Sequence, residues 1–158
     1  MENVTLKKTP EEYSKAAGEL FAKGYNCSQA VLLAFAEDAG ISEETAAMIA
    51  SSFGGGMGRL REVCGAVSGM FMTAGLLAGY SDPENHAEKT AHYKRIQELA
   101  ERFKGYNGSI VCRELLGLKK EGADSHVPEK RTDEYYKKRP CRELVEIAAK
   151  ITAEYFCA

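Results

Sequence analysis

The chain has 158 residues, with 21 Lys and Arg against 23 Asp and Glu, and 44% of its residues are hydrophobic. This length and composition are typical of one globular domain, so we treat residues 1–158 as a single domain. The net charge of −2 leaves no excess of Lys and Arg to neutralise phosphates, and we expect no nucleic-acid binding. A core of this size needs no cross-links, so the five cysteines need another explanation.

No segment predicts export or membrane insertion. Residues 1–10 are polar and lack the apolar stretch of a secretory signal. The most apolar run, residues 66–79, is too short and too rich in glycine to span a bilayer. We therefore expect a cytoplasmic protein without membrane contact, in which cysteines serve as metal ligands, redox groups or nucleophiles more often than as structural disulfides.

Helix start and stop signals divide the first third of the chain into three predicted helices. Thr9 caps the first, with Pro10 at its first position, and it stops before Gly24. Asn26 caps the second, which Gly40 ends. Ser42 caps the third, whose apolar side carries Met48, Ile49 and Phe53.

A run of glycines then breaks the helical pattern, because each glycine costs a helix about 1 kcal/mol relative to alanine. The run reads Gly54-Gly55-Gly56-Met57-Gly58. A fourth helix, from about residue 62 or 64 to residue 77, is apolar all round and rich in small residues, which predicts a place in the middle of the fold. The same helix and the glycine loop offer a surface for a homodimer.

The second half predicts three more helices and a charged loop. The fifth helix starts near Ser81, ends at Gly105 and carries His86 and His92, which we expect on the surface. The sixth spans residues 110–116 after a Ser109 cap, and the last spans residues 140–156. Between them, residues 118–139 form a long charged loop. No segment alternates as a strand does, so we predict an all-α, single-domain bundle of six to seven helices.

Four of the five cysteines fall at predicted helix starts. Cys27 follows the Asn26 cap and Cys141 follows Pro140, while Cys112 lies three residues after Ser109 and Cys64 lies just past the glycine run. Free N–H groups at a helix N-terminus stabilise a thiolate, so we expect lowered pKa values at all four cysteines, aided by Arg113 and Arg142 if these turn inward. Cys157 lies at the opposite end of the last helix and is left out of the site.

Three kinds of site agree with this placement. An iron-sulfur cluster held by the four thiolates is the first hypothesis, a zinc site is another, and metal-free dithiols that cycle to disulfides are the third. No C-x-x-C is present, so any such site is assembled by the tertiary fold. We also expect the backbone of four glycines to approach the site closely and to bind the cofactor. They are Gly54, Gly55, Gly56 and Gly65.

The segment Cys64-Gly65-Ala66-Val67-Ser68-Gly69, together with Cys27, Cys112 and Cys141, resembles the C-GCAxxG-C-C family of "putative redox-active" proteins. The order Cys64-Gly65-Ala66 departs from the Gly-Cys-Ala order in the family name. The resemblance implies that these four cysteines are the catalytic or metal-binding residues of a redox-active protein. We expect a cluster that exchanges electrons with a redox partner protein; the alternatives are a metal-free thiol-disulfide oxidoreductase and a zinc-stabilised binding module.

Overall fold

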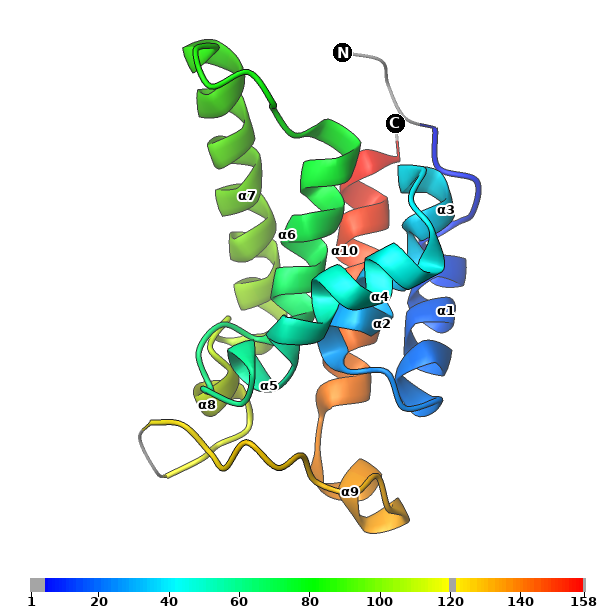
Figure 1. The fold of residues 1–158 in the computed structure, drawn as a ribbon, viewed down its shortest axis with the longest axis vertical. Coiled ribbons are helices and arrows are strands. Elements are labelled where there is room, and N and C mark those ends of the chain that lie inside the picture. Colours follow the sequence, from blue (N-terminus) through cyan, green and yellow to red (C-terminus); the bar gives the residue numbers. More distant parts are fainter. Residues whose placement is uncertain (1–4, 120–121, 158) are drawn as a thin grey trace.

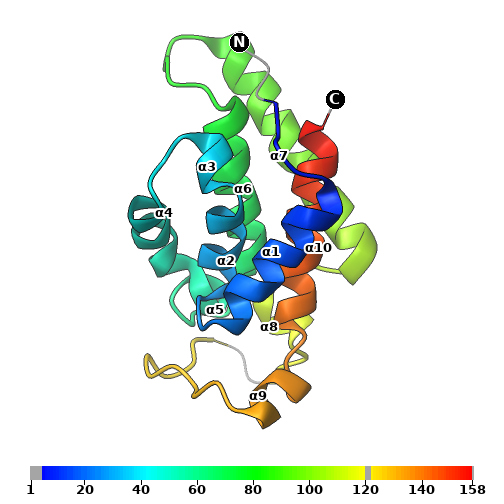
Figure 2. The same ribbon diagram turned by 90° about the vertical axis from the view of Figure 1, so that its right-hand side faces the viewer.

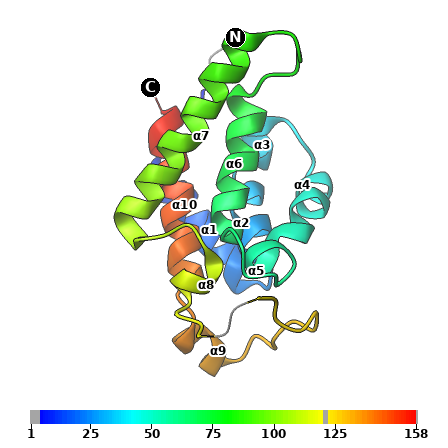
Figure 3. The same cartoon turned by 90° about the vertical axis from the view of Figure 1, so that its left-hand side faces the viewer.

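Three helices that start at the same end of the molecule form the centre of the fold. They are α2 (Cys27–Ala34), α6 (Gly65–Ala78) and α10 (Cys141–Phe156) in the computed structural model, which describes residues 5–119 and 122–157 (Figure 1). Helix α1 (Pro10–Ala22) packs against α10 and α2, as Figure 2 shows. Helix α7 (His86–Asn107) covers α6 and α10 on another side (Figure 3).

Local capping contacts explain where the early helices begin. The Thr9 side chain accepts a hydrogen bond from the Glu12 N–H at 3.2 Å. Asn26 accepts from the Gln29 N–H at 2.9 Å, and the Gln29 side chain accepts from the Asn26 N–H at 3.0 Å. Ser42 caps the helix that follows. The three predicted caps are confirmed. They can be predicted from sequence because each depends only on residues three positions apart.

The predicted all-α, single-domain class is confirmed, and the described ranges contain more helical segments than six or seven. The additional ones are short: the predicted second helix breaks at Phe35, and the charged loop holds a helix of its own. Only an isolated antiparallel bridge between Val63 and Val111 has strand character in residues 5–119 and 122–157. The remaining elements are α3 (Ala36–Ala39), α4 (Glu43–Ala50), η1 (Ser51–Phe53), α5 (Gly54–Met57), α8 (Cys112–Leu115) and α9 (Asp133–Lys138).

Helix α6 lies in the core, as predicted. Ala66, Val67, Met70 and Ala74 are fully buried, and the helix contacts α2, α7 and α10. Small residues along α6 allow these helices to approach closely, because they place little side-chain volume between the axes. Most of α6 is therefore covered within the chain. Within the described ranges, none of the helices has the length and apolar character needed to cross a membrane.

Two expectations about helix faces are wrong. Met48 and Ile49 are 67% and 50% exposed, because α4 meets the core through its fully buried alanines, Ala46 and Ala50. His92 is buried on α7, where its Nδ1 lies 2.9 Å from Arg95 Nη1. Burial lowers the pKa of His92, since desolvation disfavours the imidazolium.

Candidate functional site

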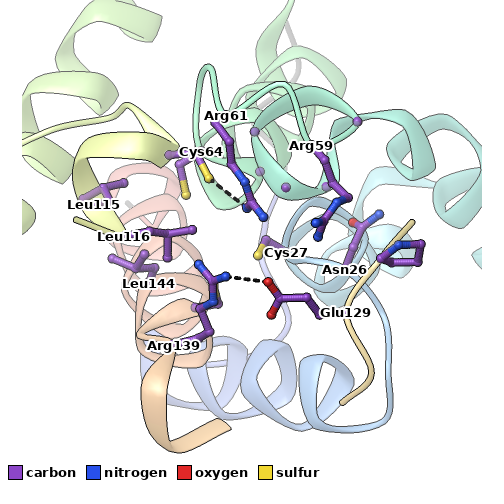
Figure 4. A pocket seen from close by; sticks show the side chains of 18 of the residues that line it. Asn26, Cys27, Arg59, Arg61, Cys64, Leu115, Leu116, Glu129, Arg139 and Leu144 are labelled. Carbon is purple, nitrogen blue, oxygen red and sulfur yellow. Dashed lines mark hydrogen bonds and ion pairs between the residues drawn. The ribbon is translucent and has the colours of Figure 1, made fainter. Parts of the chain in front are cut away.

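The four predicted cysteines line one pocket of about 340 Å³ at the end of the bundle where α2, α6 and α10 begin (Figure 4). Cys27 and Cys141 are the first residues of α2 and α10, Cys112 is the first residue of α8, and Cys64 directly precedes α6. The four cysteines therefore share one pocket. Cys157 is exposed just past the end of α10, away from these residues.

The isolated bridge brings Cys64 and Cys112 together. The Cys64 N–H donates to the Ile110 carbonyl at 2.8 Å, and the Cys112 N–H donates to the Glu62 carbonyl at 2.6 Å. These bonds flank the bridge on both sides, so they fix the two cysteine backbones in register. This pairing links segments that are distant in sequence, so no local sequence pattern predicts it.

Two glycines allow the cysteine-bearing segments to approach one another. A Cβ on Gly56, whose φ is +69°, would lie 2.6 Å from the Cys112 Cβ. A Cβ on Gly65 would lie 3.1 Å from the Cys27 Cβ and 2.9 Å from the Phe53 carbonyl oxygen. Only glycine meets both the conformational and the spatial demand at Gly56. The other glycines predicted to bind a cofactor also line the pocket; they are Gly54 and Gly55.

Cys27 and Cys141 form a hydrogen-bonded pair in which the two thiols differ strongly in acidity. The Cys27 thiol donates to the Cys141 sulfur, which lowers the pKa of Cys141 to about 7 against the opposing effect of burial. Arg139, Arg131 and a hydrogen bond from the Tyr135 hydroxyl lower it further. The same hydrogen bond, together with burial, raises the pKa of Cys27 well above its ordinary value. The pair therefore favours a thiolate on Cys141 and a proton on Cys27.

The other two cysteines keep their protons. Burial raises the pKa of Cys64 to about 12, although the N–H groups of Ala66 and Val67 point at its sulfur. Burial also raises the pKa of Cys112, and the hydrogen bond from Arg61 opposes this shift. The expectation of four lowered pKa values is therefore wrong at three positions. At Cys64 and Cys112 desolvation outweighs the effect of a helix start, and at Cys27 the hydrogen bond with Cys141 is the largest cause.

A segment that we call the strap, residues 122–139, includes α9 and contributes several residues to the lining of the pocket. In Figure 2 it lies below the end of the bundle where α2 and α10 begin. Arg59 Nε donates to the Ser125 carbonyl at 2.6 Å, and Arg61 Nε donates to Asp124 Oδ2 at 2.8 Å. Arg131 stacks 4.0 Å over the Phe21 ring and donates to backbone carbonyls of the α1–α2 region. Residues 122–139 of the predicted charged loop are thus part of the site.

Two arginines next to the glycine run escaped the sequence analysis. Arg59 and Arg61 line the pocket, and both have positive φ values, +67° and +61°, which are uncommon outside glycine. Their position directly after the glycine run, close to Cys64, is the signal that points to them. By contrast, Arg142, which we expected to assist Cys141, pairs with Glu146 at 3.1 Å on the half-exposed outer face of α10.

The arrangement does not provide a ready-made site for a single metal ion. In residues 5–119 and 122–157, no three or more His, Cys, Asp or Glu side chains are grouped so that they could hold one. A tetrahedral zinc site needs four donors within bonding distance of one ion, so the thiols as placed here do not fit zinc. They line a common space without meeting at one point.

Comparison with known proteins gives one match. A sequence model of the family described as "Putative redox-active protein (C_GCAxxG_C_C)" matches residues 25–155, which include the four pocket cysteines. Curated proteins gave no match. Solved structures gave none either.

Proposed function

The chain belongs to the C_GCAxxG_C_C family, whose members are described as "putative redox-active", and we propose that it is a thiol-disulfide oxidoreductase whose reactive pair is Cys141 and Cys27. The observation that carries this proposal is the asymmetry of the pair: one thiol of the two is acidic and receives a hydrogen bond from the other. Exchange requires a thiolate that attacks and a second thiol that resolves the mixed disulfide. A pKa of about 7 is also close to the optimum for an attacking thiol at neutral pH.

Each group around the pair has a role in this chemistry. The Cys141 thiolate attacks a disulfide, and Cys27 then attacks the Cys141 sulfur of the mixed disulfide. Arg139, Arg131 and Tyr135 favour the thiolate form of Cys141. Cys64 and Cys112 remain protonated at neutral pH, so neither acts as a nucleophile in this reaction.

The test is a redox titration of metal-free protein purified without oxygen. The protein is equilibrated with mixtures of 2-mercaptoethanol and its neutral disulfide, and disulfides are mapped by mass spectrometry. We expect one reversible disulfide between Cys27 and Cys141. It should be lost in Cys141→Ser and retained in Cys157→Ser, which removes only the exposed thiol. Absence of this disulfide across the whole range of mixtures would overturn the proposal.

A second candidate is an iron-sulfur cluster that exchanges electrons with a redox partner protein. The observation in its favour is that all four cysteines line the same pocket, together with the backbone of the glycine run. The charge on one of these thiols also raises the pKa of its neighbours. Thiolates bind such clusters, and nearby N–H groups tune them. Iron and acid-labile sulfide in matching amounts, lost on replacement of any of the four cysteines, would support it.

A further inference from the structure

The pocket that holds the Cys27–Cys141 pair is positively charged. Among its described lining residues, four arginines stand against one glutamate, Glu129. Asp124 pairs with Arg61, and the Cys141 thiolate adds one more negative charge, so the balance remains positive. In a partly enclosed pocket this charge attracts anions more strongly than it would in bulk water. The four arginines are Arg59, Arg61, Arg131 and Arg139.

Access to the pair is restricted. Cys141 is only 8% exposed, and residues of the strap form part of the pocket wall. The pocket volume of about 340 Å³ is at the small end of the range for small-molecule sites. A disulfide inside a folded protein would have to displace the strap to reach Cys141, whereas a small disulfide fits beneath it.

Two of the arginines are placed to bind the substrate. Arg61 is shared between Asp124 and the Cys112 sulfur, and Arg131 is held by backbone carbonyls. Arg59 and Arg139 flank the mouth of the pocket, with Cys27 between them in Figure 4. Arg59 donates through Nε to a carbonyl and its Nη2 lies 3.9 Å from Asp124 Oδ2, while Arg139 donates through Nη2 to Glu129. A guanidinium has five donors in all. Both arginines therefore keep N–H groups for a carboxylate.

We propose that the substrate of this site is a small disulfide that carries carboxylate groups, which Arg59 and Arg139 bind beside Cys141. This inference rests on the proposed function. The Cys141 thiolate forms a bond to one substrate sulfur, the substrate disulfide breaks, and its other half leaves as a thiolate. Cys27 then attacks the Cys141 sulfur, forms the protein disulfide and expels the second half. The protein dithiol loses two electrons, the substrate gains them, and the Cys27 proton ends on one of the two products.

The test compares three disulfides of similar size and different charge: 3,3′-dithiodipropionate, bis(2-hydroxyethyl) disulfide and cystamine. Reduced protein is mixed with each, and formation of the Cys27–Cys141 disulfide is followed by quenching and mass spectrometry. Each rate is divided by the rate of that probe with 2-mercaptoethanol, which removes differences in intrinsic reactivity. We expect the dianion to react at least about tenfold faster than the dication at low salt, and high salt should reduce this preference.

Matched variants locate the effect. Arg59→Gln and Arg139→Gln should each reduce the ratio of the dianion rate to the neutral-probe rate about threefold or more. Arg139→Gln should also slow all three probes, because Arg139 lowers the pKa of Cys141. Arg142→Gln, on the outer face of α10, should leave all three rates unchanged. Equal normalised rates for the three probes would overturn the inference while leaving the proposed function intact. If even the neutral probe forms no Cys27–Cys141 disulfide, the proposed function itself fails.

Discussion

Replacement of Cys27 by alanine tests the hydrogen bond that we consider decisive for Cys141. Cys27 is the largest cause of the lowered pKa of Cys141, which lies at about 7 instead of 9.0. If the whole shift were lost, the thiolate fraction at pH 7 would fall from about one half to about one hundredth, a decrease of about 50-fold. Each remaining thiolate would be about six to ten times more nucleophilic, because nucleophilicity rises with pKa. The net rate at pH 7 should therefore fall at most about five- to eightfold.

The assay is alkylation by iodoacetamide from about pH 5 to pH 10, with Cys141 followed at the peptide level by mass spectrometry. We expect the midpoint of the Cys141 rate profile near pH 7 in the native protein and clearly higher in Cys27→Ala. Cys27→Ser keeps an O–H donor and should recover part of the lowering. A midpoint that stays near 7 in Cys27→Ala would refute the argument, since the arginines and the helix start would then be sufficient alone.

Three further predictions concern the backbone, the pH dependence and the strap. Gly56→Ala should lower the free energy of unfolding by about 2 kcal/mol or more in urea titrations, because its Cβ would lie 2.6 Å from the nearest side-chain carbon at a φ of +69°. Gly75→Ala, with open space around the position inside α6, should instead be neutral or stabilising by up to about 1 kcal/mol. The folded pKa of Cys141 is below its unfolded value, so its contribution is lost as pH falls through 7; the stability difference from Cys141→Ser should therefore grow by about 1.5–2 kcal/mol between pH 7 and pH 9. Arg131→Met removes the stacking on Phe21 and two hydrogen bonds, and it should speed amide hydrogen exchange in residues 122–139 while exchange in α6 stays slow.

Helix starts were predictable because their chemistry is local. Thr9, Asn26 and Ser42 each bond a backbone N–H three residues further on, and this requires no knowledge of the rest of the fold. The long α7 starts later than predicted, with Asn85 as its cap in place of the region near Ser81. Both positions offer capping side chains, and only the surrounding packing selects between them.

The candidate site was predictable as a set of residues but not as a set of protonation states. The cap pattern places Cys27, Cys112 and Cys141 at helix starts, and all three line the pocket with Cys64. Their acidities depend on burial and on which groups face each sulfur, and both are consequences of tertiary structure. The role of Arg61 is of this kind, because it reaches Cys112 only through the left-handed turn after the glycine run.

A comparison of Cys27 with Cys141 shows what sets the acidity of a thiol here. Both are the first residue of a helix of eight or more residues, so the partial positive charge of the helix start is common to both. Their pKa values nevertheless shift in opposite directions. The largest cause is the hydrogen bond between the two thiols, which lowers the pKa of Cys141 and raises that of Cys27. Arg139, Arg131 and the Tyr135 hydroxyl, all on the strap, lower the pKa of Cys141 further. The strap lines the pocket and also favours the ionised form of Cys141, so its displacement would raise the pKa of this thiol.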